Sequence, residues 1–368
     1  MIPVNEPLLD HQEMRNVVEC LQTGWISSEG KFISEFESKW ATYCGMKYGI
    51  AISNGTTALE AAVWSLNLKP GSEIIIPTFT IISCAMAVIR NGHTPVLVDA
   101  EPRTWNMDVK KIEEKITPNT KAIMVVHIYG HPTDMDPVLE LARKYNLYII
   151  EDAAEVHGAE YKGKKCGSFG DVSTFSFYAN KLITTGEGGM VLTNNEQLAE
   201  RVRSFRNLCF KKERRFYHTE LGNNYRLTNL QAAIGSAQVD RINDIVMRKR
   251  KMGALYNQLL AECPHVQLPV EEQWAKHVYW MYGIVLDEKS GMDAFQCAQR
   301  LLAEGVQTRP FFLGMHEQPV LQNMGLFKNE HYPVAERIAR QGFYLPSGLA
   351  LNEKQMIEVA TALKKVLR

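Results

Sequence analysis

The sequence has no excess of charge, no paired-cysteine motif and no long apolar run. Lysine plus arginine and aspartate plus glutamate each number 41 among the 368 residues, so no overall field attracts the chain to nucleic acid or to a membrane. No stretch reaches the roughly 18 consecutive apolar residues of a membrane-spanning helix, and the N-terminus lacks the basic-then-apolar pattern of a secretion signal. We therefore expect a cytoplasmic protein that binds neither nucleic acid nor membranes.

Cysteine and histidine are present, but not in the patterns of a disulfide scaffold or a metal centre. The seven cysteines are an odd number and are scattered without a C-x-x-C pair, which predicts free thiols in a reducing compartment. The ten histidines show no H-E-x-x-H or comparable spacing, so no metal site is expected.

Strand-like and helix-like segments alternate through the first half of the chain. Apolar, β-branched runs predict strands at residues 49–53, 73–77, 95–98, 121–127, 147–151, 172–177 and 189–192. Helical spacing predicts helices at 57–66, 83–90 and 135–144. This order indicates an α/β protein whose mostly parallel sheet lies between helices. The pattern changes near residue 245, so we expect a large domain over 1–245 and a smaller α+β domain over 246–368.

Three loops are placed to bind a ligand, because ligands of an open parallel sheet lie at the carboxyl ends of its strands. The first loop, Ser53-Asn-Gly-Thr-Thr-Ala58, follows a strand and opens a helix. Gly55 lets the backbone approach a ligand, and Thr56 adds a hydroxyl at the positive end of the helix. The loop is therefore a candidate phosphate cradle, with simple helix capping as the alternative.

The other two loops carry one acid and one amine. Asp152, in Glu151-Asp-Ala-Ala-Glu155, directly follows a buried run, where a carboxylate needs a charged partner such as a protonated pyridine nitrogen, or a backbone to cap. Lys181 lies between an apolar run that includes Ser176 and a glycine-dense turn. Single lysines are usually solvated, but a desolvated lysine is a nucleophile towards carbonyl cofactors. The three loops together predict a pyridoxal-phosphate enzyme.

These loops resemble those of the DegT/StrS family, fold-type-I aminotransferases that act on nucleotide-linked keto-sugars. The resemblance covers nearly the whole chain and includes the segments Trp25-Ile-Ser-Ser28, Thr174-Phe-Ser-Phe177, Thr184-Thr-Gly-Glu-Gly-Gly-Met190 and Asn224-Tyr-Arg-Leu-Thr-Asn-Leu-Gln-Ala-Ala-Ile-Gly235. It implies transamination with glutamate as donor. Within the family the sequence is most similar to enzymes that aminate carbon 4 of GDP-4-keto-6-deoxymannose, a step towards surface polysaccharides such as O-antigen or towards secondary metabolites.

The resemblance also implies a role for each matching residue. Lys181 would bond to the cofactor and then move the proton between the cofactor and the sugar. Asp152 would pair with the pyridine nitrogen, and Glu155 would contact the ring hydroxyl, where many relatives have glutamine. The cofactor phosphate would be held by Gly55, Thr56 and Ser176.

Further matches imply a homodimer and a sugar site. Asn224 matches a residue that reaches the phosphate of the neighbouring subunit's cofactor. The candidate substrate-binding residues are Trp25, Ser27, Arg309 and His316, together with Glu187, which lies in the turn after the lysine and either shapes that turn or contacts the substrate.

Two segments depart from the family pattern. Ile81 stands where many relatives carry an aromatic residue against the cofactor ring, and an aliphatic contact is expected there; Phe79 is not given that role. The segment Arg206–Phe210 also differs, which leaves open a UDP- or dTDP-linked sugar and amination at carbon 3.

Several alternatives stay open at this point. Sugar 3-dehydratases on this fold have histidine in place of the lysine, so Lys181 favours transamination; a non-enzymatic regulator is the remote alternative. His127 is interpreted as structural rather than as a proton relay. Trp280 and Tyr282 are interpreted as core rather than base-stacking residues. The basic run Lys211, Lys212, Arg214 and Arg215 is either a solvated loop or a contact to a phosphorylated ligand.

Overall fold

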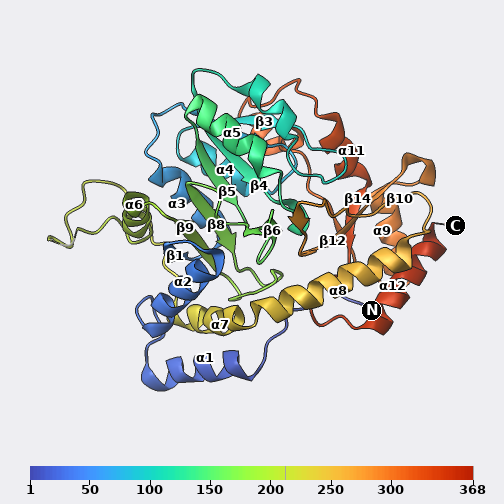
Figure 1. Cartoon of the computed structure of the whole chain (residues 1–368), viewed down its shortest axis with the longest axis horizontal. Coiled ribbons are helices and arrows are strands. Elements are labelled where there is room, and N and C mark those ends of the chain that lie inside the picture. Colours follow the sequence, from blue (N-terminus) through green and yellow to red (C-terminus); the bar gives the residue numbers. More distant parts are fainter. Residues whose placement is uncertain (212, 368) are drawn as a thin grey trace.

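A seven-stranded sheet forms the centre of the larger part of the molecule (Figure 1), in a computed structural model that describes residues 1–211 and 213–367. The strand order is β1-β9-β8-β5-β4-β2-β3, and β9 runs antiparallel to both its neighbours while the remaining neighbours pair in parallel. The strands are β1 (Tyr48–Ile52), β2 (Glu73–Pro77), β3 (Thr94–Val98), β4 (Thr120–Val126), β5 (Tyr148–Asp152), β8 (Val172–Ser176) and β9 (Gly189–Thr193). The mostly parallel α/β sheet is therefore confirmed, and each predicted strand agrees with the structure to within a residue at either end.

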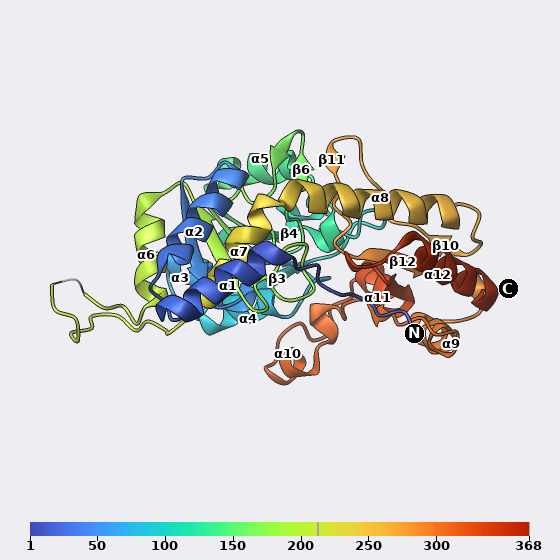
Figure 2. The same ribbon diagram turned by 90° about the horizontal axis from the view of Figure 1, so that it is seen from below.

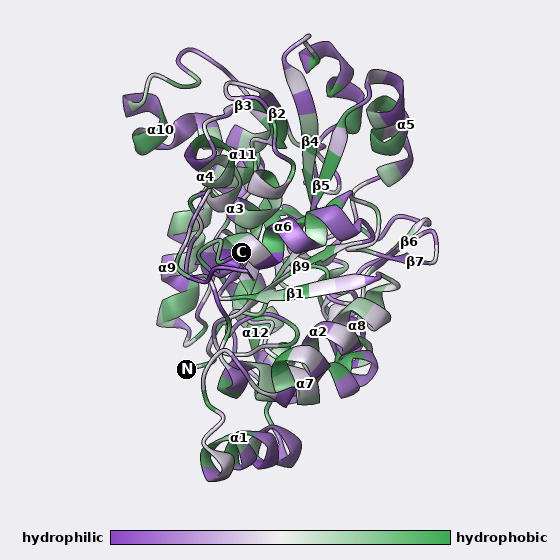
Figure 3. Ribbon diagram, turned by 90° about the vertical axis from the view of Figure 1, so that its left-hand side faces the viewer, coloured by the Kyte–Doolittle hydropathy of each residue, from purple (hydrophilic) through white to green (hydrophobic). Residues whose placement is uncertain are grey.

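Alternate residues of the central strands pack into two separate cores. Ile74 and Ile76 of β2 belong to one hydrophobic cluster and Ile75 to another, and Ile150 and Ile149 of β5 divide in the same way. Because both faces are covered, the strands are apolar throughout instead of alternating with polar residues. Figure 3 shows hydrophilic residues gathered on the outward surfaces of helices such as α1 and α5.

Helices cover both faces of the sheet (Figures 1 and 2). One core is formed with α3 and α4, and the other with α5. The connection between α6 and α7 projects away from the body of the molecule. The helices of this part are α1 (His11–Thr23), α2 (Lys31–Cys44), α3 (Gly55–Ser65), α4 (Ser83–Arg90), α5 (Met135–Tyr145), α6 (Glu196–Arg206) and α7 (Asn229–Asp240), with short 3-10 turns at Val109–Lys111, Glu113–Lys115 and Ile128–Gly130.

Helix α8 (Ile242–Leu260) runs without a break from the central sheet to a second, antiparallel sheet of order β10-β12-β14-β13. That sheet consists of β10 (Val266–Gln267), β12 (Tyr282–Leu286), β13 (Arg309–Pro310) and β14 (Gly342–Leu345). The helices around it are α9 (Ala294–Ala303), α10 (Pro319–Asn323), α11 (Pro333–Gln341) and α12 (Glu353–Val366), with 3-10 turns at Glu288–Ser290 and Met315–Glu317. A third, small sheet has the order β11-β6-β7, from β6 (Glu160–Tyr161), β7 (Lys164–Lys165) and β11 (Ala275–Lys276).

The expected domain boundary at residue 245 falls in the first turn of α8. The first residues of the chain nevertheless lie beside the second sheet, because Ile2 bridges to Val306 and the Ser347 N–H donates to the Val4 carbonyl at 2.8 Å. The division into 1–245 and 246–368 remains a prediction.

Two expectations from composition can be compared with the described residues. All seven cysteines are buried free thiols, as predicted. Among the helices of residues 1–211 and 213–367, none combines the length and the apolar character needed to cross a bilayer.

Candidate active site

The three loops singled out in the sequence meet at the carboxyl edge of the central sheet. Strands β1, β5 and β8 point in the same direction, and each ends at this edge. Asp152 is the last residue of β5 and is paired in register with Thr174, two residues before the end of β8 at Ser176. Residues separated by more than a hundred positions are brought together here because parallel strands end at the same edge.

The first loop forms a cradle at the N-terminus of α3. Asn54 caps this helix, and its side chain accepts the Thr57 N–H at 2.9 Å. A Cβ atom added to Gly55 would lie 2.7 Å from the Ser176 Cβ, so glycine is needed for the two strand ends to approach. The Thr56 hydroxyl lies 2.8 Å from the Ser83 hydroxyl. Asn54 therefore caps the helix, and the Thr56 hydroxyl faces Ser83, so capping does not use Thr56.

Asp152 is a buried carboxylate whose two oxygens are both held. Oδ1 accepts the Ala154 N–H at 3.1 Å, and the Cys84 thiol donates to Oδ2 at 3.5 Å. Burial raises the pKa of Asp152, against the opposing effects of the Ala154 N–H and the charge of Lys181. A cation placed against this carboxylate would offset the cost of its burial.

Two buried carboxylates, Glu155 and Asp152, act electrostatically on the amine of Lys181. Burial lowers the pKa of Lys181, whereas the negative charges of Glu155 and Asp152 oppose that change. Burial raises the pKa of Glu155 to about 7, against the charge of Lys181 and the hydrogen bond from the Tyr129 N–H. This amine can lose its proton more readily than an exposed lysine, as a nucleophile or general base requires.

Glu155 is positioned by an unusual turn after β4. Tyr129 has φ 53° and ψ 15°, the left-handed conformation that is rare for a residue with a side chain, and its N–H donates to Glu155 Oε2 at 2.6 Å. Backbone conformations of this kind persist where the surroundings fix them and are common at active sites.

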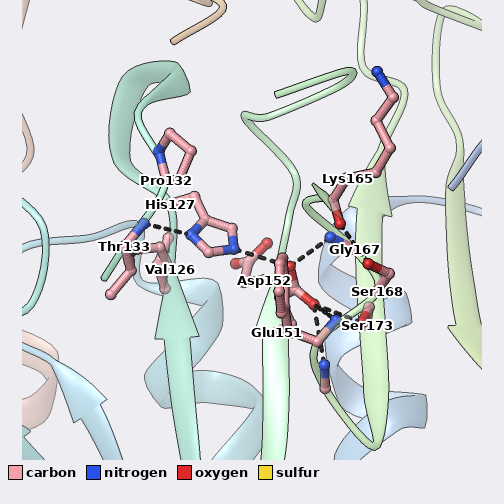
Figure 4. A network of polar contacts seen from close by, with 12 residues as sticks. Val126, His127, Pro132, Thr133, Glu151, Asp152, Lys165, Gly167, Ser168 and Ser173 are labelled. Carbon is pink, nitrogen blue, oxygen red and sulfur yellow. Dashed lines mark hydrogen bonds and ion pairs between the residues drawn. The ribbon is translucent and has the colours of Figure 1, made fainter. Parts of the chain in front are cut away.

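His127 and Glu151 form a buried network one residue away from Asp152 (Figure 4). The Thr133 N–H donates to His127 Nδ1 at 2.9 Å, so the proton of the neutral ring is on Nε2, which donates to Glu151 Oε1 at 3.0 Å. Burial raises the pKa of Glu151, but its hydrogen bonds outweigh this effect and hold the pKa below the ordinary value. The further donors to Glu151 are the N–H groups of Gly167, Phe169 and Gly170 and the hydroxyl of Ser173. These contacts favour the structural interpretation of His127.

The same network explains the one group of potential metal ligands found in the described residues. His127, Glu151 and Cys166 offer ligand atoms within 4.8 Å of one another. Both oxygens of Glu151 and both nitrogens of His127 are already hydrogen-bonded, so a metal would have to displace these bonds.

Most of the residues matched to substrate and subunit contacts are exposed, whereas Asp152 and Glu155 are buried. Within residues 1–211 and 213–367, no hydrogen bond joins any of their side chains to Lys181, Asp152 or Glu155. The exposed members of this set are Trp25, Ser27, Glu187, Asn224 and Arg309, and Ile81 is 45% exposed. Of the basic run, Lys212 lies outside the described residues.

His316 is buried instead of exposed. Its Nδ1 lies 3.1 Å from the Thr78 hydroxyl, and its Nε2 lies 3.1 Å from Glu336 Oε1. Both ring nitrogens therefore have partners inside the protein, so a direct contact with a substrate would require one of these bonds to exchange.

The chain matches the DegT/DnrJ/EryC1/StrS aminotransferase family over residues 7–364. It belongs to this family. The chain is 45% identical, over 100% of its length and 98% of the relative's, to GDP-perosamine synthase of Caulobacter vibrioides, and 41% identical, over 99% and 98%, to GDP-perosamine synthase of Escherichia coli O157:H7. It is also similar to the solved structure of S. venezuelae DesV, with a TM-score of 0.91 and 31% identity over 100% of this chain and 99% of that one. The fold-type-I architecture and a sugar aminotransferase that depends on pyridoxal phosphate, both expected from the sequence, are confirmed.

The residues of this aminotransferase fit its cofactor. A phosphate matches the cradle of Gly55, Thr56 and Ser176 at a helix N-terminus, where the approach of the two strand ends excludes a side chain at position 55. A protonated pyridine nitrogen matches the buried carboxylate of Asp152.

Sequence reasoning did not identify three residues that contact the candidate site residues of this aminotransferase. Ser83 and Cys84 open α4 and contact Thr56 and Asp152, although nothing in their local pattern distinguishes them from helix residues. Trp280 is buried, as a core residue should be, but its ring lies under Lys181, with the Lys181 Nζ 3.6 Å from the ring centroid. Tyr282, by contrast, is a fully buried core residue, as interpreted from the sequence.

Proposed function

We propose that this aminotransferase transfers the amino group of glutamate to carbon 4 of GDP-4-keto-6-deoxymannose and so makes GDP-perosamine. The observation that carries the transamination is the amine of Lys181 beside two buried carboxylates at the carboxyl edge of the sheet. The choice of sugar and nucleotide is supported by full-length similarity to proteins named GDP-perosamine synthase.

When bound, pyridoxal phosphate supplies a carbonyl that exchanges amines and a ring that accepts electrons from the reacting carbon. Gly55, Thr56 and Ser176 would hold its phosphate, with Ser83 supporting Thr56. Asp152 would keep its ring nitrogen protonated, while Glu155 would lie at the ring hydroxyl and Ile81 would pack on the ring.

The proton steps belong to Lys181. When it is not bonded to the cofactor, its Nζ would accept the proton lost by the α-carbon of the amino donor and would deliver it to the carbon that was the carbonyl carbon of the cofactor. Desolvation suits the amine for this work, because it lowers the pKa of Lys181 towards the working pH. The carboxylates of Glu155 and Asp152 stabilise the protonated form once it has accepted the proton.

The proposed active unit is a homodimer, in which Asn224 reaches the phosphate at the neighbouring active site. This residue is exposed and lies beside Asn207, at the base of the connection that projects from the body of the molecule. Sugar and diphosphate contacts are proposed for Trp25, Ser27, Glu187, Arg309 and His316. We place the enzyme in the cytoplasm, in a pathway that makes aminated deoxysugars for polysaccharides such as O-antigen, and keep the two-domain division at residue 245.

An amination assay tests the proposal. The purified enzyme, loaded with cofactor, is mixed with glutamate and GDP-4-keto-6-deoxymannose, or with UDP- or dTDP-linked 4-keto and 3-keto sugars in parallel, and the products are read by mass spectrometry. We expect exchange of one keto oxygen for one amine on the GDP sugar, with loss of the reaction in Lys181→Ala. Amination of only UDP- or dTDP-linked sugars would show that the GDP sugar is not the substrate. If no keto-sugar were aminated, the proposed activity would be refuted.

A sugar 3-dehydratase and a non-enzymatic regulator are the remaining candidates. Loss of water from a sugar without any amino donor would identify the dehydratase, and the variant Lys181→His provides the matched comparison. A biological activity that survives Lys181→Ala would favour the regulator.

A further inference from the structure

Trp280 holds the catalytic lysine at two points. Its ring lies 3.6 Å from the Lys181 Nζ, a distance at which a cation is attracted to the face of an indole. Its indole N–H donates to the carbonyl of Asn180, the residue directly before Lys181, at 2.8 Å. The amide of Asn5 donates to the same carbonyl at 3.3 Å. One side chain thus contacts both the amine of Lys181 and the main chain that carries it.

Lys249 holds the main chain of Trp280. This lysine of α8 is 2% exposed, and its Nζ donates to the Trp280 carbonyl at 3.0 Å and also to the Ser347 carbonyl. It therefore joins the segment before β12 to the segment after β14. A cavity of about 10 Å³, the volume of about one water molecule, is lined by Lys249, Trp280 and Lys181.

The turn that positions Glu155 also positions Trp280. The Val278 N–H donates to the Gly130 carbonyl at 3.0 Å, and the Met281 N–H donates to the Tyr129 carbonyl at 3.4 Å. A Cβ atom on Gly130 would lie 2.7 Å from the main-chain nitrogen of Trp280, so glycine permits this close approach of the two main chains. Because Tyr129 also donates to Glu155, the indole and the carboxylate are held by one turn.

We propose that Trp280 is a positioning residue for Lys181: its ring holds the free amine beside Glu155 and Asp152, and Lys249 fixes Trp280 in that place. The inference rests on the proposed role of Lys181. In the half of the cycle in which Lys181 is not bonded to the cofactor, its long side chain would otherwise be free to move. Ordering such a chain costs conformational entropy, and a displacement of about 1 Å can cost about 100-fold in rate. A fixed indole face removes part of this cost before the reaction.

The test measures how fast Lys181 bonds to pyridoxal phosphate that is added to cofactor-free protein, without any sugar. The rate is read from visible absorbance, and the bonded residue is identified by borohydride reduction and mass spectrometry. We expect Trp280→Leu to react about 10- to 100-fold more slowly than the wild type, because the ring and its N–H donor are both lost. Trp280→Phe keeps an aromatic ring and most of the volume, and its rate should lie between the two.

A double-mutant cycle tests the part of Lys249. Lys249→Met should slow bonding several-fold in the wild-type background and cause no further slowing in the Trp280→Leu background, since it acts through Trp280. Tyr256→Phe is the matched control, because it removes another buried hydrogen bond between α8 and the segment after β14, from the Tyr256 hydroxyl to the Pro346 carbonyl at 2.9 Å. This control should react at the wild-type rate even if its melting temperature falls.

The outcomes separate the two proposals. Wild-type protein that does not bond to pyridoxal phosphate at Lys181 refutes the proposed role of the lysine. If the wild type bonds normally, a wild-type rate in Trp280→Leu refutes the positioning role, as does equal slowing in Tyr256→Phe. Equal slowing by Lys249→Met in both backgrounds refutes the action of Lys249 through Trp280.

Discussion

Replacing Lys249 by methionine should change how the stability of the protein depends on pH. Burial lowers the pKa of Lys249 to about 7, against roughly 10.4 for an unfolded lysine. Below pH 7 the folded and unfolded states both hold the proton, and the cost of burying the charge is complete. Between about pH 7 and 10.4 the unfolded state binds more protons than the folded state, so stability rises with pH. The rise is about 1.4 kcal/mol per pH unit, or about 5 kcal/mol over the whole window.

Methionine keeps an unbranched side chain but cannot titrate or donate. The variant therefore escapes the cost of the buried charge, but it leaves the carbonyls of Trp280 and Ser347 without the donor they have in the wild type. An unsatisfied buried group costs about 1–3 kcal/mol. We expect the variant to be close to the wild type in stability near pH 7 and less stable near pH 10. The stability of the wild type minus that of the variant should therefore depend on pH, and this dependence reports on Lys249.

The measurement is the melting temperature of cofactor-free wild type and Lys249→Met, followed by circular dichroism at each unit from pH 6 to 10. An unfolding entropy of about 2.1 cal/mol/K per residue gives roughly 0.8 kcal/mol/K for the 368 residues, so a change of about 4 kcal/mol between pH 7 and 10 should change the difference in melting temperature by about 5 °C. Tyr256→Phe should show a constant difference from pH 6 to about 9, because burial raises the pKa of the folded phenol and the unfolded phenol titrates only near pH 10. A difference between wild type and Lys249→Met that stays constant from pH 7 to 10 would contradict the reasoning.

Three further predictions concern the active site and its support. Gly55→Ala should weaken pyridoxal-phosphate binding at least about 10-fold in an absorbance titration, because the added Cβ would lie 2.7 Å from Ser176; unchanged affinity would argue against the cradle. Glu155→Gln should stabilise the cofactor-free protein by up to about 3 kcal/mol at pH 8 but not at pH 4. The reason is that the pKa of Glu155 is raised to about 7, so the wild type loses stability as the pH rises through that value. Equal differences in melting temperature at both pH values would contradict this. Glu151→Gln should lower the free energy of unfolding in urea by about 3–5 kcal/mol. Both oxygens of Glu151 accept hydrogen bonds, so the NH₂ group of glutamine would face an N–H or O–H donor in place of one of these oxygens. A loss below about 1 kcal/mol would show that the network can rearrange.

Most of the sheet could be predicted from the sequence because local patterns specify it. Strands buried on both faces read as continuous apolar runs, and the seven runs predicted for the central sheet correspond to its seven strands. The strand after the lysine turn gave no sign of its direction. Strand β9 runs antiparallel because residues 177–188 turn back without a crossover helix, and that depends on packing around the turn.

The site could be predicted in part. Gly55, Asp152, Ser176 and Lys181 are recognisable because each lies at the end of a strand or in the segment that directly follows one, where the chain must leave a parallel sheet. The burial of His316 could not be predicted from the local sequence. It depends on Thr78, more than two hundred positions away in the chain, as well as on Glu336.

The sequence by itself determined that an amine, an acid and a helix N-terminus with a glycine follow strand ends, which parallel pairing brings to one edge of the sheet. Only the tertiary structure decided what surrounds the amine. Trp280 reads as an ordinary core aromatic and Lys249 as an ordinary helix lysine, and no spacing in the chain links either to Lys181. They meet because α8 and the second sheet pack against the lysine turn, and such long-range packing depends on the shape of the whole fold and leaves no local pattern in the sequence.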